Sequence, residues 1–521
     1  MSEDKGSFWE KTSLNVVINV TRTVITALIG LLLVPYYIDT LGVATYGIIP
    51  LATSISSYIL ILSDSLVSAC SRYSVMAIQR NDPDEISRTF NTALVGIGRN
   101  VLILIPVIIA FSYFSTYIFD ISGNSATEVR IMFLLILMSA AIVTFSSSFN
   151  SIFSAYNRLY ILYTARIVYS VLQVVIIVSM FALTEPSLID IGIAYVVSAV
   201  ALFSIVSYKS LKLCPSIKIR FSDYDPKIFK DMGKLGVWTI VMRVGTLLYI
   251  QMSLILSNIL IGSEAEGSFA IVVSLISMVS TACISVVVAI EPIMYKFYTN
   301  NQRDKIVKVS STALRLVSVL FAFPVAFIMV FSPELLTVWV GSEFTFLSEI
   351  IIIAYIAELA YISAPILDSI PIIFLKLNYV ALLTLIFGVV NVILAVIFVS
   401  VLDMGLVGIV SAWSVSILLQ TLMKISYASK IVGSGYFTFI KSLMYGYVMC
   451  AVCTLLLALL DSFISFTPSW LTLILLAVVT FGVYSLFVLM FMVRKDEKTM
   501  ISNVIPASIR KYLPSVIIGA K

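Results

Sequence analysis

The distribution of charge along the chain constrains its fold more than any other feature. About fourteen apolar segments, each long enough to cross a membrane as a helix, lie between Leu14 and Val493. The loops between them alternate: one set carries nearly all the Lys and Arg, and the other set is short and acidic or neutral, with Arg130 the one exception. This alternation follows the positive-inside rule. We therefore expect a multi-pass protein of the plasma membrane with both termini in the cytoplasm.

The charged residues of the two sets of loops define the expected inside and outside. The basic set comprises residues 72–88, 209–234, 296–308, 376, 424–441 and the tail from Arg494. The acidic or neutral set holds Asp39, Asp120, Glu128, Glu185, Asp190, Glu264, Glu266, Glu334, Glu343, Asp403 and Asp461.

Composition excludes several classes of function. Charged residues make up 12% of the chain, about half the share in a soluble domain, and no segment resembles a separate soluble domain. No basic stretch is long enough to form a nucleic-acid groove. The sequence has no His, which excludes His-based catalysis and His metal ligands. Cys450 and Cys453 form C-x-x-C inside an apolar helix, where packing is expected. We expect no cofactor and no metal.

The apolar segments predict an all-α polytopic protein of about fourteen transmembrane helices, because continuous apolar runs of this length suit helices and strand alternation is absent. The expected spans are residues 14–38, 44–68, 91–114, 131–153, 160–183, 188–208, 235–261, 268–292, 309–331, 348–374, 379–402, 406–428, 441–461 and 468–493.

The first half of the chain repeats in the second. Gly42 and Gly47 are matched by Gly262 and Gly267 at an offset of 220 residues, and the same offset pairs several polar residues. The repeat unit holds six helices, an even number, so both copies enter the membrane in the same sense. This predicts two pseudo-symmetric six-helix bundles, related by an axis along the membrane normal, with a site between them and two extra C-terminal helices.

The predicted domains follow from this repeat. They are an N-terminal lobe (1–208), a cytoplasmic linker (209–234), a C-terminal lobe (235–430), two additional spans (431–493) and a cytoplasmic tail (494–521). Within the linker, Asp225 and Pro226 predict a helix N-cap and first helical residue. Residues 227–234 would then form a short helix on the membrane surface, acting as a hinge or as a simple tether.

Five arginines lie inside predicted spans, each about 9–14 Å deep from the cytoplasmic end. They are Arg22, Arg99, Arg166, Arg243 and Arg315. Guanidinium groups bind phosphate oxygens bidentately and stay charged. Grouped around a central cleft, they would form a cationic cavity for a phosphate-bearing substrate. The alternative is that they extend to the cytoplasmic headgroups and only mark topology.

Intramembrane acids are fewer. Glu358 and Asp368 lie in the tenth span, Asp64 near the end of the second and Glu291 near the end of the eighth. Each is a candidate counter-ion for an arginine or a site for a coupling cation or proton. Glu358 lies deepest and is our candidate for coupling, and a structural ion pair is the alternative for Glu358 and Asp368.

Several segments resemble known transporters. Residues 35–47 (PYYIDTLGVATYG), 64–73, 332–341 (SPELLTVWVG) and 403–412 (DMGLVGIVSA) are similar to motifs of the Wzx-type polysaccharide and lipid-linked oligosaccharide flippases, with a weaker echo at 261–267. These belong to the multidrug/oligosaccharidyl-lipid/polysaccharide exporter superfamily. The motifs are degenerate, but their order and the span count cover essentially the whole chain.

This resemblance implies a two-lobed transporter, not an enzyme, that works by alternating access. It implies a polyprenyl-(pyro)phosphate-linked oligosaccharide as substrate, moved from the cytoplasmic to the outer leaflet for cell-surface glycan assembly. Membrane lipids and glycan-assembly enzymes are the implied partners. One alternative is a cation-coupled multidrug exporter of the same superfamily, although the first span has no acid before Asp39. A membrane-embedded glycan polymerase or ligase is a further alternative, although the outer loops are short.

Overall fold

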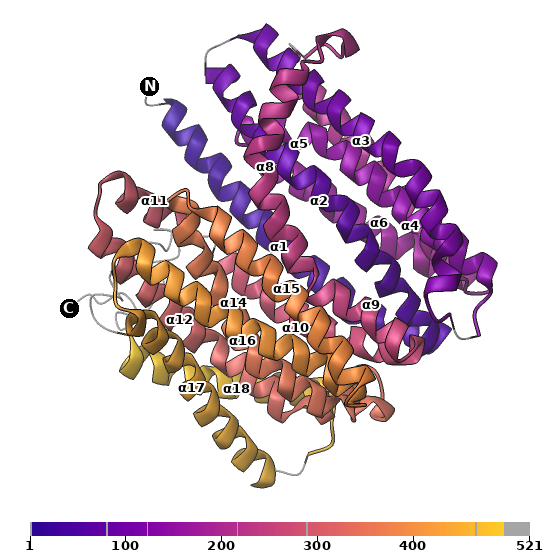
Figure 1. Cartoon of the computed structure of the whole chain (residues 1–521). Coiled ribbons are helices and arrows are strands. Elements are labelled where there is room, and N and C mark those ends of the chain that lie inside the picture. Colours follow the sequence, from indigo (N-terminus) through magenta and orange to yellow (C-terminus); the bar gives the residue numbers. More distant parts are fainter. Residues whose placement is uncertain are drawn as a thin grey trace. The chain divides into compact units, whose positions relative to one another are not determined.

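The structure, a computed structural model, describes residues 3–79, 82–121, 123–215, 217–287, 290–463 and 466–493 (Figure 1). Helices and connecting turns make up these ranges, which contain no β-strand. Thirteen of the helices are long and apolar enough to cross a membrane, and the count rises to 14 if one bent pair forms a single span. The predicted all-α polytopic fold is therefore confirmed. The predicted tail at 494–521 lies outside the described residues.

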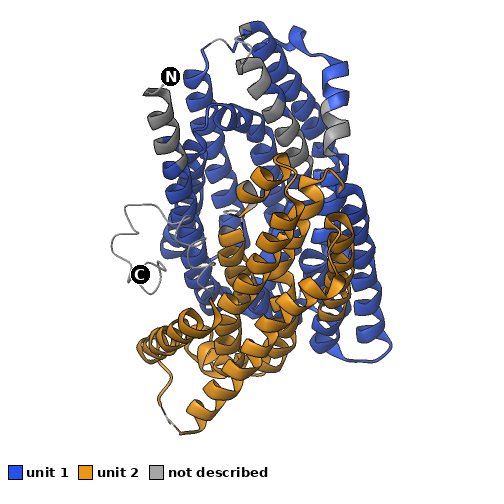
Figure 2. Ribbon diagram, turned by 90° about the vertical axis from the view of Figure 1, so that its left-hand side faces the viewer, with its two compact units in different colours: residues 1–274, 377–413 blue, residues 275–376, 414–521 orange. Residues whose placement is uncertain are grey.

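The first compact unit consists of residues 1–274 and 377–413, blue in Figure 2. Its helices are α1 (Glu3–Leu41), α2 (Val43–Gln79), α3 (Pro83–Ile118), α4 (Ala126–Ser146), α5 (Asn150–Ala155), α6 (Leu159–Leu183), α7 (Leu188–Leu213), α8 (Pro226–Leu247), α9 (Ile250–Leu260), the first part of α10 (Ser263–Val287), α15 (Leu377–Ser400) and the first part of α16 (Gly405–Val432).

The second compact unit consists of residues 275–376 and 414–521. It holds the rest of α10 and α16, together with α11 (Glu291–Thr299), α12 (Arg303–Val330), α13 (Ser332–Trp339), α14 (Leu347–Ile373), α17 (Tyr436–Phe463), α18 (Trp470–Phe487) and the π-helical turn η4 (Val488–Met492). Because α8, α9 and α15 belong to the first unit, the two six-helix lobes at 1–208 and 235–430 stay a prediction.

The predicted span 235–261 is broken in the structure. Helices α8 and α9 meet at a bend of 40°. The break leaves the carbonyl oxygen of Leu248 without a helical partner, and the side chain of Asn391 on α15 donates to it at 2.9 Å. The Tyr249 carbonyl oxygen accepts from the Ser253 N–H at 3.3 Å and has a second, longer contact with Asn391 at 3.4 Å. Backbone polar groups inside a membrane need a hydrogen-bond partner, so the Asn391 side chain makes the break possible.

Close approach of α8 and α15 depends on two glycines. A Cβ atom at Gly388 would lie 2.7 Å from the carbonyl oxygen of Gly245, so no larger residue fits without displacing backbone. Small residues allow such crossings in membrane helices, where dispersion contacts replace the hydrophobic effect. The crossing holds Asn391 against the broken span.

The linker was predicted correctly at its cap and wrongly beyond it. Asp225 is the N-cap of α8, with Pro226 in the first helical position, and its carboxylate accepts from the N–H groups of Lys227 at 2.8 Å and Ile228 at 3.2 Å. The short separate helix at 227–234 does not form. Helix α8 instead continues without interruption from Pro226 to Leu247, since no breaking residue separates the surface turn from the span.

Candidate functional site

The structure places the five candidate arginines in both compact units. Arg22, Arg99, Arg166 and Arg243 belong to the first unit and Arg315 belongs to the second. The contacts of each arginine differ. Some guanidinium groups bind the linker or another helix, and others are exposed.

Arg22 lies where α1 packs on α6, and Arg166 lies on α6. The Arg22 Nε and Nη2 atoms donate to Asn19 Oδ1 at 3.2 and 3.1 Å, and the guanidinium lies 5.8 Å from the ring centroid of Tyr163 on α6. Arg166 follows Tyr163 by three residues, so both lie on one face of α6. Arg22 is half-buried and Arg166 is exposed. The packing of α1 on α6 thus places Arg22 against an aromatic ring of α6.

Arg243 is exposed on α8 and makes no hydrogen bond or ion pair with any residue that the structure describes. Arg99 is also exposed, but its Nη1 donates to the Tyr224 hydroxyl at 3.2 Å and its guanidinium lies 5.3 Å from the centroid of the Phe229 ring. Arg99 therefore holds the linker against α3, whereas Arg243 presents its guanidinium to a ligand or to solvent.

Arg315 contacts the additional C-terminal helices. Its Nη1 donates to the carbonyl oxygen of Met492 at 3.1 Å, and its guanidinium lies 5.7 Å from the centroid of the Tyr445 ring on α17. Guanidinium groups favour both kinds of partner, a carbonyl oxygen and an aromatic face. These contacts connect α12 to the segment that follows the two predicted repeats.

The two candidate acids lie on α14 of the second unit, each beside a polar partner. Glu358 is fully buried, and the hydroxyl of Ser280 on α10 donates to its Oε1 atom, whereas Oε2 has no hydrogen-bond partner among the described residues. Asp368 forms an ion pair with Lys424 on α16, with Nζ and Oδ2 2.9 Å apart. The side chains of Asp64 and Glu291 lie outside what the structure describes.

Two charged residues that the sequence assigns to loops, Lys424 and Glu266, are buried in helices. Lys424 was counted with a basic loop, but α16 continues to Val432 and buries Lys424 to 7% exposure. Its position inside the predicted span 406–428 was the available signal. Glu266 was counted with an outer loop, but it lies in the first turn of α10 and is fully buried, with both carboxylate oxygens unpaired within the described ranges. No feature of the local sequence indicates that burial.

A group of contacts, here called the outer seam, joins the connections that follow α1, α3 and α9. Asn258 accepts from the Asp120 N–H at 2.9 Å and donates to the Asp120 carbonyl oxygen at 3.1 Å, and the Asp120 carboxylate accepts from the Ser263 N–H at 2.8 Å. In addition, Thr45 donates to Asn124 at 3.0 Å. These connections all carry the charge pattern expected outside the membrane.

Gly47 and Gly267, which the predicted repeat makes equivalent, face each other in the outer seam. A Cβ atom at Gly47 would lie 2.7 Å from the Ser263 carbonyl oxygen and 2.8 Å from the Gly267 nitrogen, and a Cβ atom at Gly267 would collide with the Val43 carbonyl oxygen. The two helix starts can approach only because both positions lack a side chain. Contact between equivalent positions is the arrangement expected near the axis that relates two copies of a repeat.

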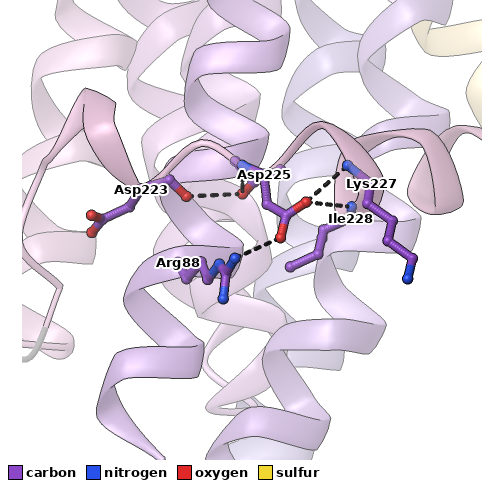
Figure 3. Close-up of polar contacts among 6 residues, drawn as sticks. Arg88, Asp223, Asp225, Lys227 and Ile228 are labelled. Atoms are coloured by element: carbon purple, nitrogen blue, oxygen red, sulfur yellow. Dashed lines mark hydrogen bonds and ion pairs between the residues drawn. The ribbon is translucent and has the colours of Figure 1, made fainter.

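The linker is fixed to α3 by a second set of contacts (Figure 3). Arg88 forms an ion pair with Asp225 at 2.7 Å, and the Asp225 N–H donates to the Thr92 hydroxyl at 3.1 Å. The N–H groups of Ile228 and Lys227, with the Arg88 guanidinium, hold the pKa of the Asp225 carboxyl below its ordinary value. Asp225 therefore caps α8 and anchors it to α3 at the same time.

The chemistry available to these residues is ion pairing and hydrogen bonding. In the described ranges, no three Cys, Asp or Glu residues lie close enough together to hold a metal ion. The exposed guanidinium groups suit an anion, and the buried Glu358 carboxyl beside a hydroxyl suits the binding of a proton or a small cation.

Comparisons with known proteins agree with this architecture. The described fold is similar to an inward-facing multidrug resistance MATE family transporter of the MOP superfamily, with a TM-score of 0.68, 16% identity and coverage of 81% of this chain and 98% of that one. It is also similar to the MATE multidrug transporter DinF-BH in complex with R6G, with a TM-score of 0.63, 15% identity and coverage of 81% and 95%. At these identities the likeness shows the fold alone.

Sequence comparison adds the family. The chain is 24% identical over 502 residues to the uncharacterized membrane protein EpsK of Bacillus subtilis (strain 168), covering 94% of this chain and 97% of that protein. The family described as "Polysaccharide biosynthesis protein" matches residues 14–298, more than half of the chain. The predicted resemblance is thereby confirmed, and the chain belongs to this polysaccharide biosynthesis family.

Proposed function

We propose that the protein is a flippase that moves a polyprenyl-(pyro)phosphate-linked oligosaccharide from the cytoplasmic to the outer leaflet of the plasma membrane. The transport needs no bond to be made or broken, so we assign no catalytic residue. The family supports a role in glycan assembly, and the residues of the first unit support a phosphate-bearing substrate.

The observation that carries the proposal is the placement of Arg22 and Arg243 inside predicted spans. Arg22 is half-buried on α1, with its guanidinium 5.8 Å from the centroid of the Tyr163 ring, and Arg243 presents an exposed guanidinium from α8. Charge at this depth is costly and needs an anionic partner to offset it. A phosphate or pyrophosphate group, with several anionic oxygens, matches bidentate guanidinium donors. Arg99 and Arg315, which contact the linker and α17, would support the site rather than bind the substrate directly.

The orientation follows from the loop charges. They favour cytoplasmic termini, and the arginines would then lie nearer the cytoplasmic leaflet, where a lipid-linked glycan would enter. The outer seam would then close the opposite side. Alternating access would require the Asp120–Asn258 and Asp120–Ser263 hydrogen bonds to separate so that the head group can leave. The polyprenyl chain can stay in lipid throughout.

The test is transbilayer movement of a polyprenyl-pyrophosphate oligosaccharide in proteoliposomes. A charge-assisted hydrogen bond contributes about 1.5–3 kcal/mol, so Arg22→Gln and Arg243→Gln should each weaken substrate affinity about ten- to a hundred-fold. Arg130→Gln is the matched control. Its guanidinium also contacts aromatic rings, with the Tyr113 centroid 4.6 Å away, but it lies at the predicted outer end of α4.

Loss of movement in both test variants, with unchanged thermal stability and a normal Arg130→Gln control, would support the proposal. Movement that survives in both test variants would reduce these arginines to topology signals at the cytoplasmic headgroups. A loss of similar size in Arg130→Gln would show that any missing arginine impairs the protein and would remove the support for this site.

A cation-coupled exporter of drug-like molecules is the second candidate, and Glu358 favours it. A carboxylate that is fully buried beside the Ser280 hydroxyl is costly while charged, and binding a proton or a cation neutralises it. The same group could couple glycan transport to a gradient. The two candidates therefore differ in substrate rather than in mechanism, and a head-to-head transport assay separates them.

A further inference from the structure

A cavity of about 540 Å³ lies between the start of α6 and the end of α7 in the first unit. Three cations line it: Arg158, which precedes α6, and Lys209 and Lys212 in the last turns of α7. No Asp or Glu is among the lining residues, and none of the three cations forms an ion pair with a residue that the structure describes. The positive charge of the cavity is therefore uncompensated by the residues that the structure describes.

The backbone around the cavity is held firmly. The Asn15 side chain on α1 donates to Asn157 Oδ1 at 2.9 Å and accepts from the Tyr160 N–H at 2.7 Å. The Arg158 N–H donates to the Phe153 carbonyl oxygen at 2.8 Å. In addition, the Tyr156 hydroxyl contacts the sulfur of the buried Cys214, the residue that follows α7, at 3.5 Å. The three cationic residues therefore lie on backbone that is held by hydrogen bonds or by helix α7.

The cavity opens onto an apolar stripe. Val168, a lining residue, begins a row with Val171, Val175 and Val178, spaced three or four residues apart along one face of α6 and each 40–53% exposed. Ten residues of helix separate the first and last of these, which is a rise of about 15 Å. This is about half of a bilayer core of about 30 Å, the depth of one leaflet.

From this arrangement we infer that the α6–α7 cavity binds an anionic phospholipid of the cytoplasmic leaflet. The lipid phosphate would lie among Arg158, Lys209 and Lys212, and an acyl chain would follow the valine stripe. Basic pockets between transmembrane helices on the cytoplasmic side have this chemistry. A free phosphate would satisfy the cations but would leave the stripe without a partner, which is why we commit to a lipid. The inference uses the proposed membrane orientation but does not depend on the transported substrate.

The test is binding of phosphatidylglycerol to the purified full-length protein, measured by native mass spectrometry and by thermal stabilisation. Phosphatidylcholine and inorganic phosphate are the comparison ligands. One basic residue contributes about 1 kcal/mol to attraction of an anionic lipid, which is about five-fold in affinity. Arg158→Gln, Lys209→Gln and Lys212→Gln should each weaken binding by about that factor, and the triple variant on the order of 100-fold.

The matched control neutralises three exposed lysines outside the cavity, Lys230, Lys296 and Lys305, and should leave phosphatidylglycerol binding unchanged. Should the triple variant fail to fold, the three single variants carry the comparison. Equal binding of phosphatidylglycerol and phosphatidylcholine, or an equal loss in the control, would overturn the inference. So would stabilisation by inorganic phosphate alone, which would indicate a free-anion site, or competition between phosphatidylglycerol and a polyprenyl phosphate, which would assign the cavity to the transported substrate. None of these measurements requires transport activity.

Discussion

Breaking the Lys424–Asp368 ion pair should destabilise the second unit more than any surface charge change on the same helix. Lys424 Nζ and Asp368 Oδ2 lie 2.9 Å apart, with side chains only 8% and 19% exposed. Asp368 Oδ1 is buried with no other partner among the described residues, so Lys424 supplies its main compensation. Removing either group leaves the other as a buried, unpaired charge.

The size of the effect follows from this burial. Loss of one partner of a buried pair costs about 3–5 kcal/mol, whereas replacement of both partners by apolar residues of similar volume is neutral or stabilising. Because Asp368 retains partial exposure, Lys424→Met should fall near the low end, at about 3 kcal/mol. The Lys424→Met/Asp368→Leu double variant should be at least as stable as either single variant, so the two changes are strongly non-additive.

The assay is reversible unfolding in mixed micelles, followed by the loss of helical circular dichroism, with the two single variants and the double variant forming a double-mutant cycle. Lys430→Met is the control, because Lys430 is exposed on the same helix six residues further along. Two results would contradict this reasoning. One is a loss of unfolding free energy in Lys424→Met no larger than that in Lys430→Met, and the other is a double variant whose loss equals the sum of the two single losses.

Three further predictions concern the outer seam, the α8–α9 break and the linker of the first unit. Gly267→Ala should open the outer seam, because the added methyl collides with the Val43 carbonyl oxygen, and labelling of cysteines introduced beside the seam should become faster; unchanged labelling would contradict this. Asn391→Ala should destabilise by about 1–3 kcal/mol, since the Leu248 carbonyl oxygen loses its partner at the α8–α9 break; an unfolding midpoint equal to that of the wild type would contradict it. The contacts that Asp225 makes with α3 and with the start of α8 should form fully above the pKa of an unfolded Asp, about 3.9. They should be lost as the pH falls through the lower pKa that Asp225 has in the folded protein. Hydrogen exchange of residues 217–228 measures this, and Asp225→Asn should give rapid exchange at neutral pH as well.

Local signals in the sequence predicted the spans and the cap because each depends on neighbouring residues. Asp225 followed by Pro226 caps α8 whatever lies around it, and apolar runs of about twenty residues form helices because lipid cannot satisfy free backbone groups. The repeat predicted that Gly47 and Gly267 are equivalent, and the structure adds that they face each other.

Contacts between distant segments could not be predicted in this way. The break between α8 and α9 depends on Asn391, more than 140 residues away, and nothing in the span itself indicates a bend. The positive-inside rule explains why Lys424 was misplaced, because it counts charges near helix ends and cannot detect that one of them is paired with Asp368. The arginines were located by depth alone, so their partners, such as Tyr163 for Arg22 and Tyr224 for Arg99, appeared only in three dimensions.

The central claim is the identity of the transported molecule. Its most direct test is a single set of wild-type proteoliposomes given a polyprenyl-pyrophosphate oligosaccharide and, in parallel, a cationic drug such as R6G. Our account predicts that the glycan lipid reaches the opposite leaflet faster than in protein-free vesicles and that the drug does not accumulate. Drug transport without glycan-lipid movement would contradict the account and would make this chain a drug exporter that shares the family's fold.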